Sequence, residues 1–182
     1  VVTVSSTSVP TTADANGGID TLILNPVNSI TVYEQAGNYG FELGTPGGLT
    51  AIDFENINLQ PGNGLLNIVG DQGQGTNVGG AGVDAADVVE VIGTAQNAGG
   101  LRLNNIAVPQ FVQFAGVTNL NINTFDLDDD VTIDPFASTT LNWNIVVNVD
   151  AGAGDDDISY GNAAVIPGLD PIPNGSAAAV SE

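Results

Sequence analysis

The chain has 182 residues, of which 42% are hydrophobic, and this is enough to bury the core of one domain or two small ones. Its formal net charge is −20, because 21 acidic residues are set against a single basic one, Arg102. Such a charge repels nucleic acids and anionic membranes, so nucleic-acid binding is excluded. The chain lacks His and Lys, which activate Ser or Thr nucleophiles in catalytic triads and dyads, and we expect no enzymatic activity.

The first segment, residues 1–17, is rich in Val, Thr and Ser, and Val2 and Val4 alternate with polar residues before Pro10. We expect an extended N-terminal arm that can add a β-strand to a neighbouring subunit. The chain starts without an initiator Met, which predicts that a signal peptide or precursor segment has been removed. The expected location is therefore extracellular or at the cell surface.

The second segment, residues 18–165, consists of short runs in which apolar and polar residues alternate, as in Leu120-Asn121-Ile122. This period of two is typical of strands that bury one face. Clusters of Gly, Asn, Asp and Pro separate the runs and favour turns, and the chain contains 24 Gly. The sequence thus predicts an all-β body.

A weak internal repeat runs through this body, with Asp followed by apolar residues two and four positions later. It occurs at Asp20, Asp87, Asp129 and Asp156. The segment that begins at Leu120 corresponds to the one that begins at Val147, position by position at a constant offset, which suits one coil of a solenoid. We therefore predict a β-solenoid, like a parallel β-helix, and an antiparallel β-sandwich is the alternative.

One motif predicts a metal ion. Residues 151–159, Ala-Gly-Ala-Gly-Asp-Asp-Asp-Ile-Ser, resemble the calcium-binding nonapeptide of RTX proteins, and residues 79–84 match its first six positions. The resemblance implies calcium bound by Asp156 and Asp84. A second acidic loop contains Asp126 and residues 128–130, where close like charges favour solvation or a shared cation. The predicted calcium ligands are Asp155, Asp156, Asp157, Asp128, Asp129, Asp130 and Asp84.

A broader pattern resembles the β-strand repeats of very large bacterial surface proteins. Residues 114–122, Phe-Ala-Gly-Val-Thr-Asn-Leu-Asn-Ile, precede residues 128–133, Asp-Asp-Asp-Val-Thr-Ile, as in those repeats. The resemblance implies a secreted role at a surface.

The last segment, residues 166–182, is rich in Pro, Gly and Ala and is expected to be a tail. No apolar run in the chain approaches the roughly 18 residues of a membrane span, so we expect no membrane insertion.

Two functions remain open. The first is a structural subunit of a surface layer or filament, stabilised by calcium and forming a homo-oligomer or polymer through its sheet edges. The second is a calcium-dependent adhesin or carbohydrate-binding module of a larger protein, whose partner would be a surface polysaccharide. The aromatic residues that could stack on a sugar are Tyr33, Tyr39, Tyr160 and Trp143. Trp143 alternates with apolar neighbours, and this pattern favours a position in the core for it.

Overall fold

The computed structural model describes residues 1–7, 9–35, 37–44, 47–70, 86–104, 106, 111–125, 127–135 and 143–161. These residues form fifteen strands and no helix. In chain order the strands are β1 (Val2–Val4), β2 (Thr11–Asp14), β3 (Thr21–Leu24), β4 (Ile30–Gln35), β5 (Asn38–Glu42), β6 (Gly48–Ile52), β7 (Asn56–Leu59), β8 (Leu65–Val69), β9 (Val88–Ala95), β10 (Ala98–Leu103), β11 (Val112–Ala115), β12 (Asn119–Asn123), β13 (Asp130–Asp134), β14 (Val146–Asp150) and β15 (Asp157–Tyr160). The all-β expectation is confirmed.

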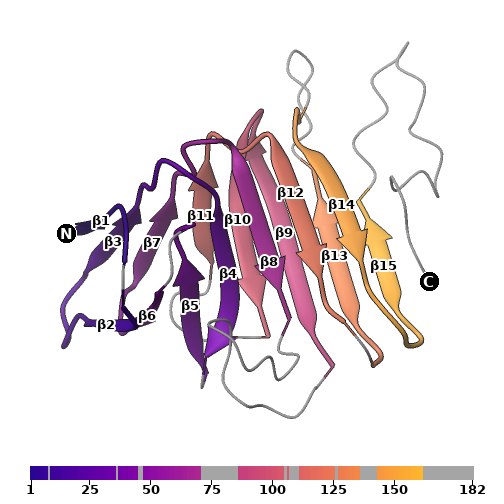
Figure 1. Ribbon diagram of the computed structural model, residues 1–182. Coiled ribbons are helices and arrows are strands. Elements are labelled where there is room, and N and C mark those ends of the chain that lie inside the picture. The colour runs from indigo at the N-terminus through magenta and orange to yellow at the C-terminus, as the bar shows by residue number, and fades with distance from the viewer. Residues whose placement is uncertain are drawn as a thin grey trace.

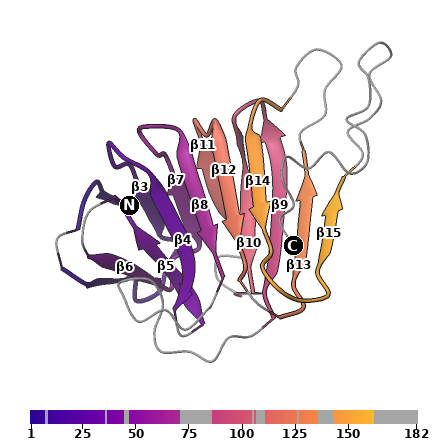
Figure 2. The ribbon, with the colours of Figure 1, turned by 45° about the vertical axis from the view of Figure 1, so that its right-hand side comes forward.

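The strands form two sheets that lie one in front of the other (Figure 1). Sheet A has eight strands in the order β1-β3-β7-β11-β10-β9-β13-β15, and sheet B has seven in the order β14-β12-β8-β4-β5-β6-β2. Along most of its length the chain alternates between the two sheets, and we call one stretch through both sheets a pass. Neighbouring strands in a sheet therefore come from successive passes. Strands β14 and β15 are edge strands at one end of the two sheets, and the opposite edge strands are β1 in sheet A and β2 in sheet B. Figure 2 shows β15 on the far side of the molecule from β3.

Most of the strand pairs are parallel. Among the described residues, nine of the thirteen ladders run parallel. The antiparallel ones come from β5 and β10, each of which pairs with both of its neighbours in sequence. Both sheets are therefore mixed. This arrangement differs from the antiparallel sandwich considered as the alternative, because parallel neighbours need a crossover through the other sheet.

The constant offset seen in the sequence is confirmed as the register of the last two passes. Leu120 pairs with Val147 in sheet B, and Val131 pairs with Ile158 in sheet A. The preceding passes use longer offsets, with Leu66 opposite Leu120 and Val89 opposite Val131. Strands β9 to β11 and the segment that follows β8 lengthen these passes, which explains why the sequence repeat is irregular.

The core lies between the sheets and is lined by alternate residues of the strands. In β3, Leu22 and Leu24 are fully buried, and in β12 Leu120 and Ile122 are their counterparts in the other sheet. Because side chains alternate between the two faces of a strand, the polar residue between each pair faces outward. The alternating runs of the sequence therefore identified the core positions correctly.

Residues 1–17, predicted to be an arm, contain two strands that pair within the chain. Strand β1 pairs in parallel with β3, and β2 pairs in parallel with β6. Each lies at the edge of its sheet among the described residues. The predicted tail at 166–182 lies outside the described residues.

Candidate functional site

The acidic residues of the repeat lie at the corner where the chain enters sheet A. The turn from β12 to β13 carries residues 128–130, and the turn from β14 to β15 carries residues 155–157. These turns stack on one another, because Asp130 pairs with Asp157 at the start of the two strands. Six of the seven predicted ligands are therefore brought together, while Asp84 lies outside the described residues.

Within this corner, side-chain carboxylates bind the backbone of the adjacent pass. The N–H of Asp129 donates to Asp156 Oδ1 over 3.0 Å, and the N–H of Asp87 donates to Asp129 Oδ1 over 2.8 Å. The row continues to Asn104, whose Nδ2 donates to Asp87 Oδ1 over 2.7 Å. We call Asp87, Asp129 and Asp156 the carboxylate ladder. It supplies acceptors for amides that stand outside the regular strand pairing.

A hydrogen bond from a backbone N–H to the side-chain carboxylate of another pass also occurs near the N-terminal end of sheet A. The N–H of Asp20, which precedes β3, donates to Glu55 Oε2 over 2.7 Å, and Glu55 precedes β7. The repeated Asp of the sequence therefore marks the residue before a strand. Its spacing was visible in the sequence, but the hydrogen-bond partner of each Asp, which lies in another strand or turn, was not.

Burial separates the predicted calcium ligands into two groups. Asp129 is 2% exposed, like Asp87 at 0%, and Asp156 is half-buried, so these carboxylates are turned toward the protein. The others, Asp128, Asp130, Asp155 and Asp157, are exposed. Asp128 Oδ1 accepts the N–H of Asp155 over 2.9 Å, which ties the two turns together. In the part of the chain that the structure describes, no group of three or more acidic residues is arranged to hold a metal ion.

The glycines of the predicted nonapeptide allow the two turns to stack closely. A Cβ atom on Gly152 would lie 1.3 Å from the carbonyl oxygen of Phe125, and one on Gly154 would lie 1.9 Å from that of Leu127. The N–H of Ala153 donates to the Phe125 carbonyl, and the N–H of Leu127 donates to the Ala153 carbonyl. The resemblance of this segment to the nonapeptide implied a calcium site, and the structure gives its glycines a role in packing the two turns.

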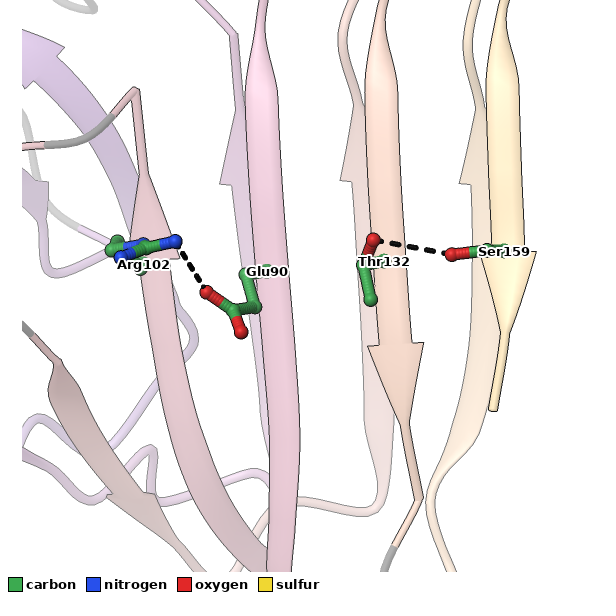
Figure 3. A network of polar contacts seen from close by, with 4 residues as sticks. All are labelled: Glu90, Arg102, Thr132 and Ser159. Carbon is green, nitrogen blue, oxygen red and sulfur yellow. Dashed lines mark hydrogen bonds and ion pairs between the residues drawn. The ribbon is translucent and has the colours of Figure 1, made fainter. Parts of the chain in front are cut away.

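A polar row crosses the outer face of sheet A (Figure 3). Arg102 of β10 forms an ion pair with Glu90 of β9 over 2.7 Å, and farther along the face the hydroxyls of Thr132 and Ser159 lie 3.1 Å apart. These residues face one another in register across four strands. Arg102 also lies over the ring of Phe111 at 5.6 Å, so the single basic residue is held on both sides.

A second polar row crosses the outer face of sheet B. Asn148 donates from Nδ2 to Asn121 Oδ1 over 2.9 Å, Asn121 donates to Asn67 Oδ1 over 3.0 Å, and Asn67 donates to Thr31 Oγ1 over 3.3 Å. We call these residues the amide ladder. Sequence analysis missed it, although the signal was present in the Asn that repeats between two aliphatic residues in β8, β12 and β14.

The aromatic residues considered for sugar stacking are mostly inside the protein. Tyr33 and Tyr39 are buried, and Trp143 packs partly buried against the core, as its alternation predicted. Burial raises the pKa of Tyr39 to about 12, against smaller opposing effects from the Leu103 backbone and the charge of Arg102. Of the four, Tyr160 is the exposed residue, with 42% of its surface accessible.

The comparisons with known proteins gave no relative. No family model, no curated protein and no solved structure matches the chain. A search of the described residues for a helix long and apolar enough to cross a membrane also found none.

Proposed function

We propose that the protein is an extracellular structural subunit of a cell-surface layer or filament, which associates with its own copies by β-strand addition and is stabilised by calcium. The observation that carries the proposal is the open edge of both sheets at one end, where β14 and β15 each have a single partner strand among the described residues. An unpaired edge presents backbone donors and acceptors to another chain.

We also propose that the fold is a β-solenoid elaborated by inserted strands. The parallel ladders and the equal offset of the last two passes in both sheets support this assignment. A solenoid grows by stacking equivalent coils, and each added coil buries the face of the one before. A subunit of this kind can extend by the contacts that already join its passes.

Calcium enters the proposal through the exposed carboxylates of the stacked turns. Asp130 and Asp157 are directly opposite, and Asp128 and Asp155 lie two residues earlier in the same two turns. Like charges in opposite positions destabilise a sheet, and a hard divalent cation relieves the repulsion through oxygen ligands. The resemblance of residues 151–159 to a calcium-binding nonapeptide supports the same ion.

Thermal unfolding tests the calcium proposal. An ion that binds the folded state alone raises the free energy of unfolding by RT ln(1 + [L]/Kd), which is about 2.7 kcal/mol at a calcium concentration of 100 Kd. The melting temperature should therefore rise when calcium replaces a chelator, and magnesium at equal ionic strength serves as the control. Equal melting temperatures in calcium and in chelator would remove calcium from the proposal.

Sedimentation velocity with and without calcium tests the assembly. The proposal expects large species whose fraction grows with protein concentration. A protein that remains monomeric at all concentrations would exclude the structural subunit. It would favour the second candidate, a calcium-dependent adhesin or carbohydrate-binding module, to which the exposed Tyr160 lends some support as a stacking surface.

A further inference from the structure

We infer that β15 of one copy accepts β1 of a second copy as the next strand of sheet A. The inference rests on the proposed function and names the joint between subunits. Strands β1 and β15 are the two edge strands of sheet A in the part of the chain that the structure describes. All strands of this sheet except β10 point the same way, so a copy placed head to tail adds β1 to β15 in parallel.

The side chains of the two strands match when Ser159 lies opposite Thr3. In β15, Ile158 and Tyr160 are in register with the buried Val131 and Ile133, so both face the inner side of the sheet. In β1, Val2 and Val4 are in register with the buried Leu22 and Leu24 and face the same side. Joining the strands places Val2 beside Ile158 and Val4 beside Tyr160.

The outer side of the joint continues the polar row of sheet A. Thr132 and Ser159 already form a hydroxyl pair there (Figure 3), and Thr3 of the second copy would extend it by one residue. Cross-strand pairs of Thr and Ser hydroxyls stabilise adjacent strands.

The backbone groups of the two edges are also in phase. The N–H of Asp157 donates to the carbonyl of Asp129, just before β13, and the N–H of Gly161 donates to that of Ile133 in β13. The backbone groups of Ile158 and Tyr160 therefore point to the open edge. The carbonyl of Val4 accepts from Asn25 beside β3, so the groups of Thr3 point outward from β1. In a parallel ladder Thr3 then bonds to both Ile158 and Tyr160.

Exposure and charge both suit the pairing of β1 with β15. Val2 is 45% exposed and Tyr160 is 42% exposed, so each edge leaves part of an apolar side chain in water. Strand β1 carries no charged side chain, so it places no like charge beside Asp157 at the start of β15. Opposed like charges are unfavourable, and the uncharged β1 avoids them.

Cysteine cross-linking tests the joint, and the chain has no Cys of its own. The double variant Thr3→Cys with Ser159→Cys should form a ladder of disulfide-linked oligomers under mild oxidation, seen on a non-reducing gel. The two positions are seven strand spacings apart within one chain, about 34 Å, so a link inside the chain is impossible. The matched control is the double variant Thr12→Cys with Ser159→Cys. Thr12 is exposed but lies in sheet B, so this variant should give no ladder. Each single variant stops at a dimer.

A proline substitution gives a second readout. Thr3→Pro removes the outward N–H and leaves the bonds from β1 to β3 in place, so it should raise the protein concentration needed for assembly about tenfold. Thr3→Val keeps the donor and loses only the hydroxyl contact, so it should raise that concentration much less than Thr3→Pro does. If the protein assembles but the Thr3 and Ser159 thiols do not form a ladder, the joint is overturned and the structural subunit stands. If no variant assembles, wild type included, both are overturned.

Discussion

Gly152 lies where a side chain would collide with the turn of the preceding pass. A Cβ atom there would be 1.3 Å from the Phe125 carbonyl oxygen, and the backbone at Gly152 has a φ of 76°. Backbone atoms cannot move aside as a flexible side chain can. At the residue scale, the repeat therefore depends on positions that lack a side chain, such as Gly152, as well as on the side chains of its other residues.

Gly152→Ala should therefore lower the free energy of unfolding by about 3 kcal/mol or more, because it adds a steric clash to the strain of a positive φ. Gly116→Ala is the matched control, since Gly116 has a φ of 74° but open space around its Cβ position. That variant should lose about 1 kcal/mol. Urea unfolding of both variants measures the difference, and equal losses would show that the turns do not stack as described.

The carboxylate of Asp129 is the second residue on which the corner depends. It accepts the N–H of Asp87, and both residues are buried. Asp129→Ala leaves that buried amide without this acceptor and should cost about 2–3 kcal/mol of unfolding free energy. Asp134→Ala, at the exposed end of the same strand, should change it by less than about 0.5 kcal/mol. The reverse order in denaturant unfolding would contradict the structural role of the ladder.

At the scale of elements, polar rows align the strands as the apolar core does. The amide ladder joins β4, β8, β12 and β14 on the outer face of sheet B, with each Asn donating to the preceding pass. A slip of one residue would turn every Asn inward, so the ladder opposes slippage.

The middle of the amide ladder should contribute more to the free energy of unfolding than its end. Asn121 takes part in two side-chain hydrogen bonds and Asn148 in one. Asn121→Ala should therefore cost about 1–2 kcal/mol, and Asn148→Ala about half as much. Thermal unfolding of the two variants provides the comparison. A larger loss for Asn148→Ala would indicate that the end of the ladder has a partner that these contacts do not include.

At the scale of the whole molecule, the two sheets pack face to face over a core that buries the hydroxyl of Tyr39. Burial raises the pKa of all three tyrosines, and Tyr39 reaches about 12 from an ordinary value of 10. A raised pKa in the folded state means that stability is fully present below the unfolded value and is lost as the pH rises through the folded one. The folded state should thus lose stability between pH 10 and about 12.

Absorbance titration of the phenolate measures this effect directly. The tyrosines of the folded protein should ionise at a higher pH than those of protein unfolded in urea. Tyr39→Phe should remove the ionisation that occurs at the highest pH. If Tyr39 titrates near pH 10 while circular dichroism still reports folded sheets, its hydroxyl is not buried as described.

The sequence by itself determined the all-β class, the alternation that builds the core and the constant offset between the last two passes. These properties depend on local periodicity, because the two faces of a strand differ in polarity along the chain itself. It also located the acidic turns at 128–130 and 155–157.

The tertiary structure decided what those turns contact. The partner of Asp129 is the backbone amide of Asp87, and the reason for Gly152 is the carbonyl of Phe125 in the preceding pass. The strands inserted between β8 and β12 make the separations between passes irregular, so no single period in the sequence predicts them. The tertiary structure also decided the pairing of β1 with β3. That pairing depends on which edge of sheet A the other strands leave open.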